Sequence, residues 1–341
     1  IKLIQICSVI LVTGSSGLIG SHILYDLIAR KEKVRALYRS ESRKERIQQL
    51  FNYYNEKLNQ THNYDDIEWF KADIMDLEAL NESFNGVQKV IHCAALVSFH
   101  KLDFHRCMSI NRRGTENVVN LCLKNKVKKL CYISSTAALG SSGNPISENA
   151  RWESGKEVSG YSVSKYSAEK EVFRGVAEGL NCSIVNPCLV FGPGNWHRSS
   201  LTLLKAGSKG LRFYPSGANA IVDVRDVSTI VLKLLDSEES GEKYLVIGHN
   251  ISFKSLFTHI SKAFNKPAPQ RKLNRFIALT TAYIVENVYR VFRKRSPISI
   301  ESIQSAYKTL EYSNEKVKKR FDYKFYSIED TIENAVKGRF K

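Results

Sequence analysis

The chain has no apolar run long enough to cross a bilayer, and it has no low-complexity tract or internal repeat. Its longest late apolar stretch, 276–292, is interrupted by Glu286, Asn287 and Arg290. A stretch this polar predicts an amphipathic helix. We expect its apolar side to pack against its own domain, with a basic contact on a membrane surface as the alternative, so no membrane contact is expected. No secretory signal is found, and residues 1–7, which lack a start methionine, are open to interpretation as a leftover or mis-started leader.

Paired cysteine motifs are also missing. The seven cysteines are odd in number and irregularly spaced, and no two form a Cys-x-x-Cys pair. This pattern argues against a disulfide framework, a metal site or a redox motif. Several cysteines lie in apolar runs, where cysteine behaves as a small buried hydrophobe. We therefore expect reduced thiols, no metal and a cytoplasmic location.

Acidic residues are in the minority, because 34 Asp and Glu stand against 51 Lys and Arg, a formal net charge of +17. The basic residues are spread along the chain without zinc-finger spacing or an arginine-rich arm, so no specific nucleic-acid surface is expected. The simplest interpretation is a solvated basic surface that attracts anionic ligands such as a cofactor phosphate.

Short β-branched runs alternate with helical stretches in the first half of the chain. We expect strands at 8–13, 33–38, 67–71, 89–93, 129–134 and 182–186, and helices at 18–30, 43–55, 77–84, 111–125 and 161–178. This alternation predicts an α/β fold, a doubly wound parallel sheet of the Rossmann type. Beyond Pro187 shorter elements indicate a smaller C-terminal substrate lobe. We place the dinucleotide-binding domain at 8–190 and the lobe at 191–341, with later strands near 220–247 joining or flanking the sheet.

A glycine-rich turn joins the first strand to the first helix, and it reads Gly14-Ser15-Ser16-Gly17-Leu18-Ile19-Gly20. One glycine permits the tight turn, one lets the backbone approach a pyrophosphate, and one lets helix and strand pack closely. The phosphates then meet the N–H groups of the helix N-terminus. The turn predicts a dinucleotide site that uses Gly14, Ser16, Gly17, Leu18, Ile19 and Gly20.

The end of the second strand bears on the choice of cofactor. A site selective for NAD carries Asp or Glu there to bind the ribose hydroxyls, whereas this chain carries Arg39. A guanidinium can hold a 2′-phosphate through two parallel hydrogen bonds. NADP(H) is therefore the favoured cofactor, with NAD(H) as the alternative if Arg39 is merely solvated.

Tyr161 and Lys165 open a predicted helix at a spacing that puts both on one face. A nearby ammonium lowers the pKa of a phenol, so that Tyr161 can exchange a proton with a carbonyl or alcohol oxygen. Ser135, after the preceding strand, offers a hydroxyl to the same oxygen. Tyr166 and Lys170 repeat the spacing, but five residues turn a helix by roughly 140°, so both pairs cannot face one site.

The chain resembles the extended short-chain dehydrogenases/reductases over nearly its whole length. The ordered segments that carry the resemblance are Thr13–Gly20, Ala72-Asp73-Ile74, His92-Cys93-Ala94-Ala95, Asn111-Arg112-Arg113-Gly114-Thr115, Ser134-Ser135, Tyr161-x-x-Ser164-Lys165-x-x-Ala168-Glu169, Asn186-Pro187-x-x-Val190-x-Gly192-Pro193-Gly194 and Asp223-Val224-Arg225-Asp226-Val227. Within the family, the segments 34–39 and 186–194 look most similar to dihydroflavonol reductases, whose relatives resemble the 3β-hydroxysteroid dehydrogenases. One departure stands out, because the usual Arg or Lys before the proline is Asn186.

The resemblance implies a role for further residues. It selects Tyr161/Lys165 over the second pair, because Ser precedes the lysine and Ala-Glu follows it. It places Asp73 and the Ile74 backbone at the adenine, and Ala94 and Ala95 near the ribose and nicotinamide. Lys165 is expected to bind the nicotinamide ribose, and the backbone from Pro187 to Val190 is expected to face the carboxamide. It also implies a homodimer through the helices at 111–125 and 161–178.

Three functions follow as hypotheses. The leading one is an NADPH-linked reductase of a small-molecule ketone or aldehyde, with Ser135, Tyr161 and Lys165 as the catalytic residues. The second is a nucleotide-sugar epimerase or dehydratase with retained NAD, whose diphosphate could meet the basic side chains Lys205, Lys209, Arg212 and Arg225. The third is a non-catalytic dinucleotide-binding protein. In the lobe, the aromatic residues Trp196, Phe213, Tyr214, Phe253, Phe257 and Phe276 either line a substrate pocket or form ordinary core.

Overall fold

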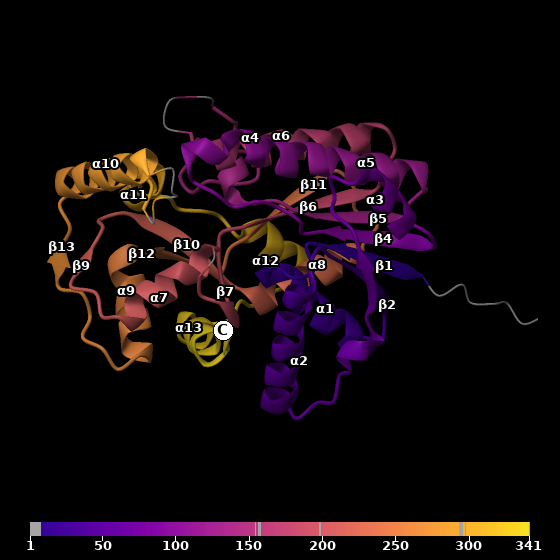
Figure 1. Cartoon of the computed structure of the whole chain (residues 1–341), viewed down its shortest axis with the longest axis horizontal. Helices are drawn as coiled ribbons and strands as arrows, with labels where there is room; N and C mark the ends of the chain where they lie inside the picture. The colour runs from indigo at the N-terminus through magenta and orange to yellow at the C-terminus, as the bar shows by residue number, and fades with distance from the viewer. Residues whose placement is uncertain are drawn as a thin grey trace, which may run out of the picture.

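A computed structural model describes residues 8–153, 155, 158–197, 199–292, 296 and 298–340 (Figure 1). Residues 1–7, for which the sequence leaves a leader open, lie outside the described residues. Within the described ranges, none of the helices combines the length and the apolar character that a bilayer crossing needs.

A seven-stranded sheet forms the centre of the fold, in the order β11-β6-β5-β4-β1-β2-β3. Every neighbouring pair is parallel. The strands are β1 (Val9–Thr13), β2 (Lys33–Tyr38), β3 (Glu68–Lys71), β4 (Val87–His92), β5 (Lys129–Ile133), β6 (Cys182–Pro187) and β11 (Glu242–Val246). The strand order reverses between β1 and β4, which is the switch point of a doubly wound sheet, where ligands bind at the carboxyl ends of the strands. The predicted α/β Rossmann-type fold is confirmed.

Helices cover both faces of this sheet, because the strands are apolar on both sides. Ile10 and Val12 of β1 belong to one core, whereas Val9 and Leu11 belong to the other, as the two-residue period of a strand requires. The first core is covered by α1 (Leu18–Ala29), α2 (Lys44–Leu58), α8 (Val224–Leu235) and α12 (Glu315–Phe321). The second is covered by α3 (Leu77–Ser83), α5 (Gly114–Lys124) and α6 (Gly160–Ala177).

The helix predicted at 111–125 begins earlier than its sequence pattern indicates. Helix α4 (Phe104–Cys107) continues through a π-helical segment, Met108–Arg113, into α5. Such wide turns gather at functional sites. Here the segment contains Asn111, whose buried side chain donates to the carbonyl oxygen of Leu96 and accepts from the Leu96 amide, at 2.9 and 2.7 Å.

The chain after β6 forms smaller sheets and a core of its own. A three-stranded sheet has the order β12-β10-β7, and the predicted strand near 220–224 lies in it as β10. The remaining elements are β7 (Leu189–Phe191), β8 (Gly194–Asn195), α7 (Thr202–Ser208), β9 (Phe213–Tyr214), β10 (Ala218–Asp223), β12 (His249–Ser252), α9 (Phe253–Ala263), β13 (Arg271–Lys272), α10 (Arg275–Val291), α11 (Ile300–Ala306), α13 (Ile328–Lys337) and β14 (Arg339–Phe340). Three elements after residue 190, namely α8, β11 and α12, return to the large sheet.

The helix expected at 276–292 is present as α10, but the expected burial of its apolar side is wrong. Only Ala278 and Ala282 of α10 are buried, whereas Phe276 and Val291 are 77% and 79% exposed. The apolar pattern in the sequence shows that such a helix has an apolar face, and the fold decides whether anything covers that face.

Candidate dinucleotide and catalytic site

The glycine turn has the geometry that a phosphate cradle needs. Gly14 has a φ of +66°, and a Cβ there would lie 2.5 Å from the amide nitrogen of Ala94 on the neighbouring chain segment after β4. A Cβ on Gly20 would lie 2.4 Å from the carbonyl oxygen of Gly14. No side chain can occupy either position without moving backbone, so the turn stays tight and close to β4.

The N-terminus of α1 is open to an anion. Its N-cap residue, Gly17, has no side chain to satisfy the first amides, and the first turn, which begins Leu18-Ile19, carries no acidic residue. Gly17 is exposed and Ser16 is partly exposed. Free amides at the positive end of a helix are the groups that bind a pyrophosphate. The turn therefore fits the dinucleotide that the sequence predicts.

Arg39 and Asp73 lie together at the far side of the turn. They follow β2 and β3, and their side chains form an ion pair of 3.3 Å with 47% and 40% exposure. The second carboxylate oxygen of Asp73 accepts from the Met75 amide at 3.0 Å, and Ile74 between them is buried. The structure thus brings together the two side chains expected at the adenine end, with Arg39 accessible to an anionic group.

The other predicted cofactor residues follow β4 and β6. Ala94 is partly exposed and Ala95 exposed, and the Ala94 amide donates to Thr13 Oγ1 at 3.3 Å. Pro187 ends β6, and Val190 is buried in β7. All of them lie at or beyond the carboxyl ends of β4 and β6, where the doubly wound fold places its ligand.

Tyr161 and Ser135 meet where β5 and α6 face each other. Tyr161 is buried near the start of α6, and its ring packs on Phe99 with centroids 5.5 Å apart. Burial raises the pKa of Tyr161 to about 12, against a lowering by the hydrogen bond with Ser135. The phenol is therefore neutral at neutral pH, the form that can donate a proton.

Lys165 does not act on Tyr161 in this structure as the sequence predicted. Its ammonium donates to Tyr132 Oη at 2.6 Å and to the Ile133 carbonyl at 2.9 Å. Burial lowers the pKa of Lys165 to about 7, while Glu169 raises it. The expectation that Lys165 lowers the pKa of Tyr161 is wrong here, because the nearest phenol to the ammonium is Tyr132 and burial outweighs every other effect on Tyr161.

A buried polar chain leads away from Lys165, and sequence reasoning missed it. Tyr132 hydrogen-bonds with Thr115, Thr115 Oγ1 lies 3.0 Å from His92 Nε2, and His92 Nδ1 lies 2.6 Å from Thr13 Oγ1. Burial lowers the pKa of His92 to about 3, so the imidazole is neutral. The chain links the predicted catalytic lysine to the strand that enters the glycine turn. The sequence did contain one indication of this chain, because His92 and Thr115 lie in two of the segments that carry the family resemblance.

Asn186 shares a buried carboxylate with a lysine from another strand. The buried carboxylate of Glu169 accepts from Ser134 Oγ at 2.6 Å, Asn186 Nδ2 at 2.6 Å and Lys243 Nζ at 2.7 Å. Lys243 comes from β11, which pairs with β6 beside Asn186. Lys243 thus places a cation against the carboxylate that also binds Asn186, and no sequence spacing indicated this.

The remaining candidates are engaged elsewhere. Tyr166 stacks on Trp152 with centroids 4.2 Å apart, and Lys170 lies over the Tyr166 ring, so the second pair forms a surface cluster. Arg225 forms two hydrogen bonds with Asp223, at 2.9 and 2.6 Å. Of the other basic candidates for a diphosphate, Lys205 contacts His197.

In the lobe, Trp196, Phe253 and Phe257 are core residues, whereas Phe213 and Phe276 are exposed. Among the described residues, no group of three or more His, Cys, Asp or Glu side chains is placed to hold a metal ion.

The strand order and the open glycine turn together define a dinucleotide-binding protein of the Rossmann type. Residues 10–248 match the model of the NAD dependent epimerase/dehydratase family. The chain is 25% identical over 333 residues to a Synechocystis sp. protein named as a dihydroflavonol 4-reductase, covering 95% of this chain and 92% of that one. It superposes on the crystal structure of gox2253 with a TM-score of 0.77 and 28% identity, over 97% of both chains. It also shares the fold of the Bordetella bronchiseptica enzyme WbmH, solved with NAD+, with a TM-score of 0.73 and 19% identity over 97% of both chains.

The chain belongs to the NAD dependent epimerase/dehydratase family. It is an enzyme of the extended short-chain dehydrogenase/reductase type, and the resemblance stated from the sequence is confirmed. Both reductases and epimerases occur among its relatives, so the family alone does not choose between them.

Proposed function

We propose that the enzyme is an NADPH-linked reductase of ketones or aldehydes. The observation that carries the proposal is the position of Tyr161, buried near the start of α6 and close to Ser135, which follows β5 at the carboxyl end of the parallel sheet. The similarity to a protein named as a dihydroflavonol 4-reductase, which extends over 95% of this chain, favours a ketone substrate.

In the proposed reaction, Tyr161, Ser135 and Lys165 each have a separate role. Bound NADPH supplies a hydride to the carbonyl carbon. Tyr161 gives its phenolic proton to the carbonyl oxygen, and Ser135 holds that oxygen with its hydroxyl. The ammonium of Lys165 offsets the negative charge left on Tyr161, because an opposite charge nearby stabilises a phenolate. This role requires the ammonium to turn toward Tyr161 from Tyr132, its partner in this structure.

Arg39 supports the choice of NADPH over NADH. Its guanidinium is half exposed and forms an ion pair with Asp73. A 2′-phosphate placed there would gain a charge-assisted hydrogen bond. Asp73 in turn holds Arg39 at the end of β2.

The test is turnover with a defined panel. Purified protein is mixed with NADPH and aromatic, aliphatic and steroid ketones, and NADPH oxidation is followed by absorbance. Tyr161→Phe should lower kcat/KM at least 100-fold, in line with the usual contribution of a general acid. Tyr166→Phe is the matched control, since it sits on the same helix at the second Tyr/Lys spacing, and it should keep full activity. Full turnover by Tyr161→Phe would refute the proposed role.

The same experiment distinguishes the reductase hypothesis from the epimerase hypothesis. A nucleotide-sugar epimerase would keep NAD through purification and would not consume added NADPH. The engagement of Arg225 by Asp223 removes one of the cations that a diphosphate would need. A non-catalytic protein would bind NADPH and reduce no member of the panel. The predicted homodimer through α5 and α6 stays a proposal, which light scattering of the purified protein tests.

A further inference from the structure

Helix α10 (Arg275–Val291) presents an unusual amount of apolar surface to solvent. Fifteen large hydrophobic side chains are exposed among the described residues, and seven of them belong to this helix or to the residue that caps it. They are Phe276, Ile277, Tyr283, Ile284, Val288, Val291 and Phe292. Single exposed apolar residues need no explanation, but a contiguous group marks an interaction site.

The exposed residues share one side of the helix. Ile277, Ile284, Val288 and Val291 recur at intervals of seven, four and three residues, which keeps them on one face. The opposite side carries the two small buried residues Ala278 and Ala282 and contacts α11. The helix thus rests on its domain through its small residues and turns its large apolar residues outward.

Basic side chains are exposed at both ends of α10, whereas the one acidic side chain of the helix is bound to α11. Arg271, Lys272, Arg275 and Arg290 are exposed at the two ends of the helix. The only acidic residue of α10, Glu286, is partly buried and accepts from the backbone amide of Ile300 at the start of α11. Basic side chains around an apolar helix face suit an anionic lipid surface, because the apolar groups enter the acyl boundary while the long cationic side chains reach the headgroups.

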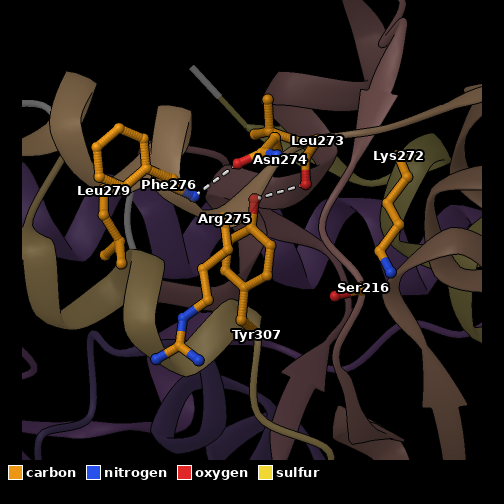
Figure 2. Close-up of a pocket in the computed structure, with 8 residues that line it drawn as sticks. All are labelled: Ser216, Lys272, Leu273, Asn274, Arg275, Phe276, Leu279 and Tyr307. Atoms are coloured by element: carbon orange, nitrogen blue, oxygen red, sulfur yellow. Dashed lines mark hydrogen bonds between the residues drawn. The ribbon is translucent and has the colours of Figure 1, made fainter.

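An open hollow of about 810 Å³ is lined by residues at the N-terminal end of α10 and before it (Figure 2). Its wall combines the cations Lys272 and Arg275 with the apolar side chains Leu273, Phe276 and Leu279. Tyr307, which also lines it, donates to the Leu273 carbonyl at 3.0 Å and so holds the β13–α10 connection in place. The hollow contains none of Ser135, Tyr161 or Lys165, so it is separate from the catalytic site. Its mixed wall suits the junction between a lipid headgroup and its acyl chain.

Helix α11, on which α10 rests, contacts the helix that carries the predicted catalytic tyrosine. Glu301 of α11 hydrogen-bonds with the backbone of Gly160, the first residue of α6, and faces Lys101. The neighbouring Leu102 is 77% exposed. In Figure 1, α10, α11 and α4 lie along the same edge of the molecule.

We propose that the exposed face of α10 docks onto the surface of a bilayer that contains anionic lipids, without crossing it. The inference stands on the surface of α10 and does not rest on the proposed reductase activity. The expectation of no membrane contact is therefore replaced by a proposal of reversible surface binding. Surface binding is driven by insertion of the apolar side chains and by attraction between the anionic headgroups and a chain of net charge +17.

The test is flotation of the full-length protein with vesicles of phosphatidylcholine alone and of phosphatidylcholine with 30% phosphatidylglycerol. The test variant is Ile284→Glu/Val291→Glu, at positions 56% and 79% exposed. The matched control is Leu58→Glu/Leu77→Glu, at positions 51% and 58% exposed on α2 and α3. Both variants add the same charge at solvent-facing sites. Circular dichroism verifies that each is folded.

We expect the wild-type chain to float with the anionic vesicles far more than with the neutral ones, and less so in high salt. The α10 variant should lose at least tenfold in partition coefficient, while the control stays within twofold of wild type. The proposal is overturned if wild type ignores anionic vesicles or if both variants bind alike. It is also overturned if wild type is an oligomer that the α10 variant converts to monomer with no vesicle binding, because a second copy is then the occupant. NADPH turnover on a water-soluble ketone should be unchanged in the α10 variant, which keeps this test distinct from that of the proposed function.

Discussion

Replacing Lys243 by glutamine should destabilise the protein by about 3 kcal/mol, although Lys243 lies at the edge of the central sheet. Its ammonium is 2.7 Å from Glu169, whose side chain is only 2% exposed, while Lys243 itself is 20% exposed. Removing one partner of a buried pair costs roughly 3 to 5 kcal/mol, because the remaining charge stays in a low-dielectric site. The partial exposure of Lys243 places the expected cost at the lower end of that range.

The cost translates into a measurable shift of the melting temperature. At about 2 cal/mol/K per residue, the unfolding entropy of 341 residues is about 0.7 kcal/mol/K. A loss of about 3 kcal/mol should therefore lower Tm by about 4 °C in scanning calorimetry.

The control is Lys337→Gln, which removes an ion pair with Glu333 of 2.5 Å whose side chains are 64% and 57% exposed. Exposed pairs contribute about 0 to 1 kcal/mol, so Tm should move by at most about 1 °C. The double variant Lys243→Gln/Glu169→Gln should recover much of the loss, since no unpaired charge is left in the core. Equal shifts for Lys243→Gln and Lys337→Gln, or a double variant less stable than either single one, would refute the reasoning.

Three further predictions concern pH and the cofactor. Reduction needs a charged Lys165, whose pKa burial lowers to about 7, and a protonated Tyr161, whose pKa is about 12. We therefore expect kcat/KM to fall as pH rises above about 7. Because Glu169 raises the pKa of Lys165, Glu169→Gln should move that fall to lower pH, and a pH profile of both proteins measures this. Arg39→Ser should raise the Kd for NADPH by about 10- to 100-fold, the range expected for a charge-assisted hydrogen bond, and leave the Kd for NADH within twofold. Arg30→Ser is the control, because Arg30 is a similarly exposed arginine paired with Asp236. Equal losses of affinity for both cofactors would contradict a 2′-phosphate contact. Burial raises the pKa of Asp26 from 3.8 to about 6, so its contribution to stability is present below about pH 4 and is lost as pH rises through 6; Asp26→Asn, which can still accept from Ser228, should flatten this part of the Tm-against-pH curve, and an unchanged curve would exclude Asp26 as its cause.

The sequence predicted those parts of the molecule that depend on neighbours along the chain. The glycine turn lies between a strand and a helix, so its place between these elements followed from local pattern. Its place at the switch point became visible only with the strand order. The pair Tyr161 and Lys165 was chosen over Tyr166 and Lys170 by adjacent residues, and the contact of Tyr166 with Trp152 agrees with that choice.

What the sequence could not predict depends on contacts between distant segments. Tyr132 and Lys165 are 33 positions apart, and Lys243 and Glu169 are 74 apart. Nothing in the pattern of β11 distinguishes Lys243 from a solvated strand lysine, because its function appears only when β11 pairs with β6. The pKa of Tyr161 was misjudged for the same reason, since burial is a property of the folded state.

The polar chain behind Lys165 fixes the tautomer of a histidine. Thr115 Oγ1 gives its proton to the Asn111 carbonyl at 2.5 Å, so it can only accept from His92 Nε2. His92 therefore carries its proton on Nε2, and its Nδ1 takes the proton of Thr13. Tyr132 likewise directs its proton toward Thr115, and its oxygen turns only lone pairs toward the ammonium. Proton donation therefore converges on Thr115, from His92 on one side and from Tyr132 on the other. Because the Tyr132 oxygen offers Lys165 only lone pairs, the network favours the protonated amine in a site where burial opposes it.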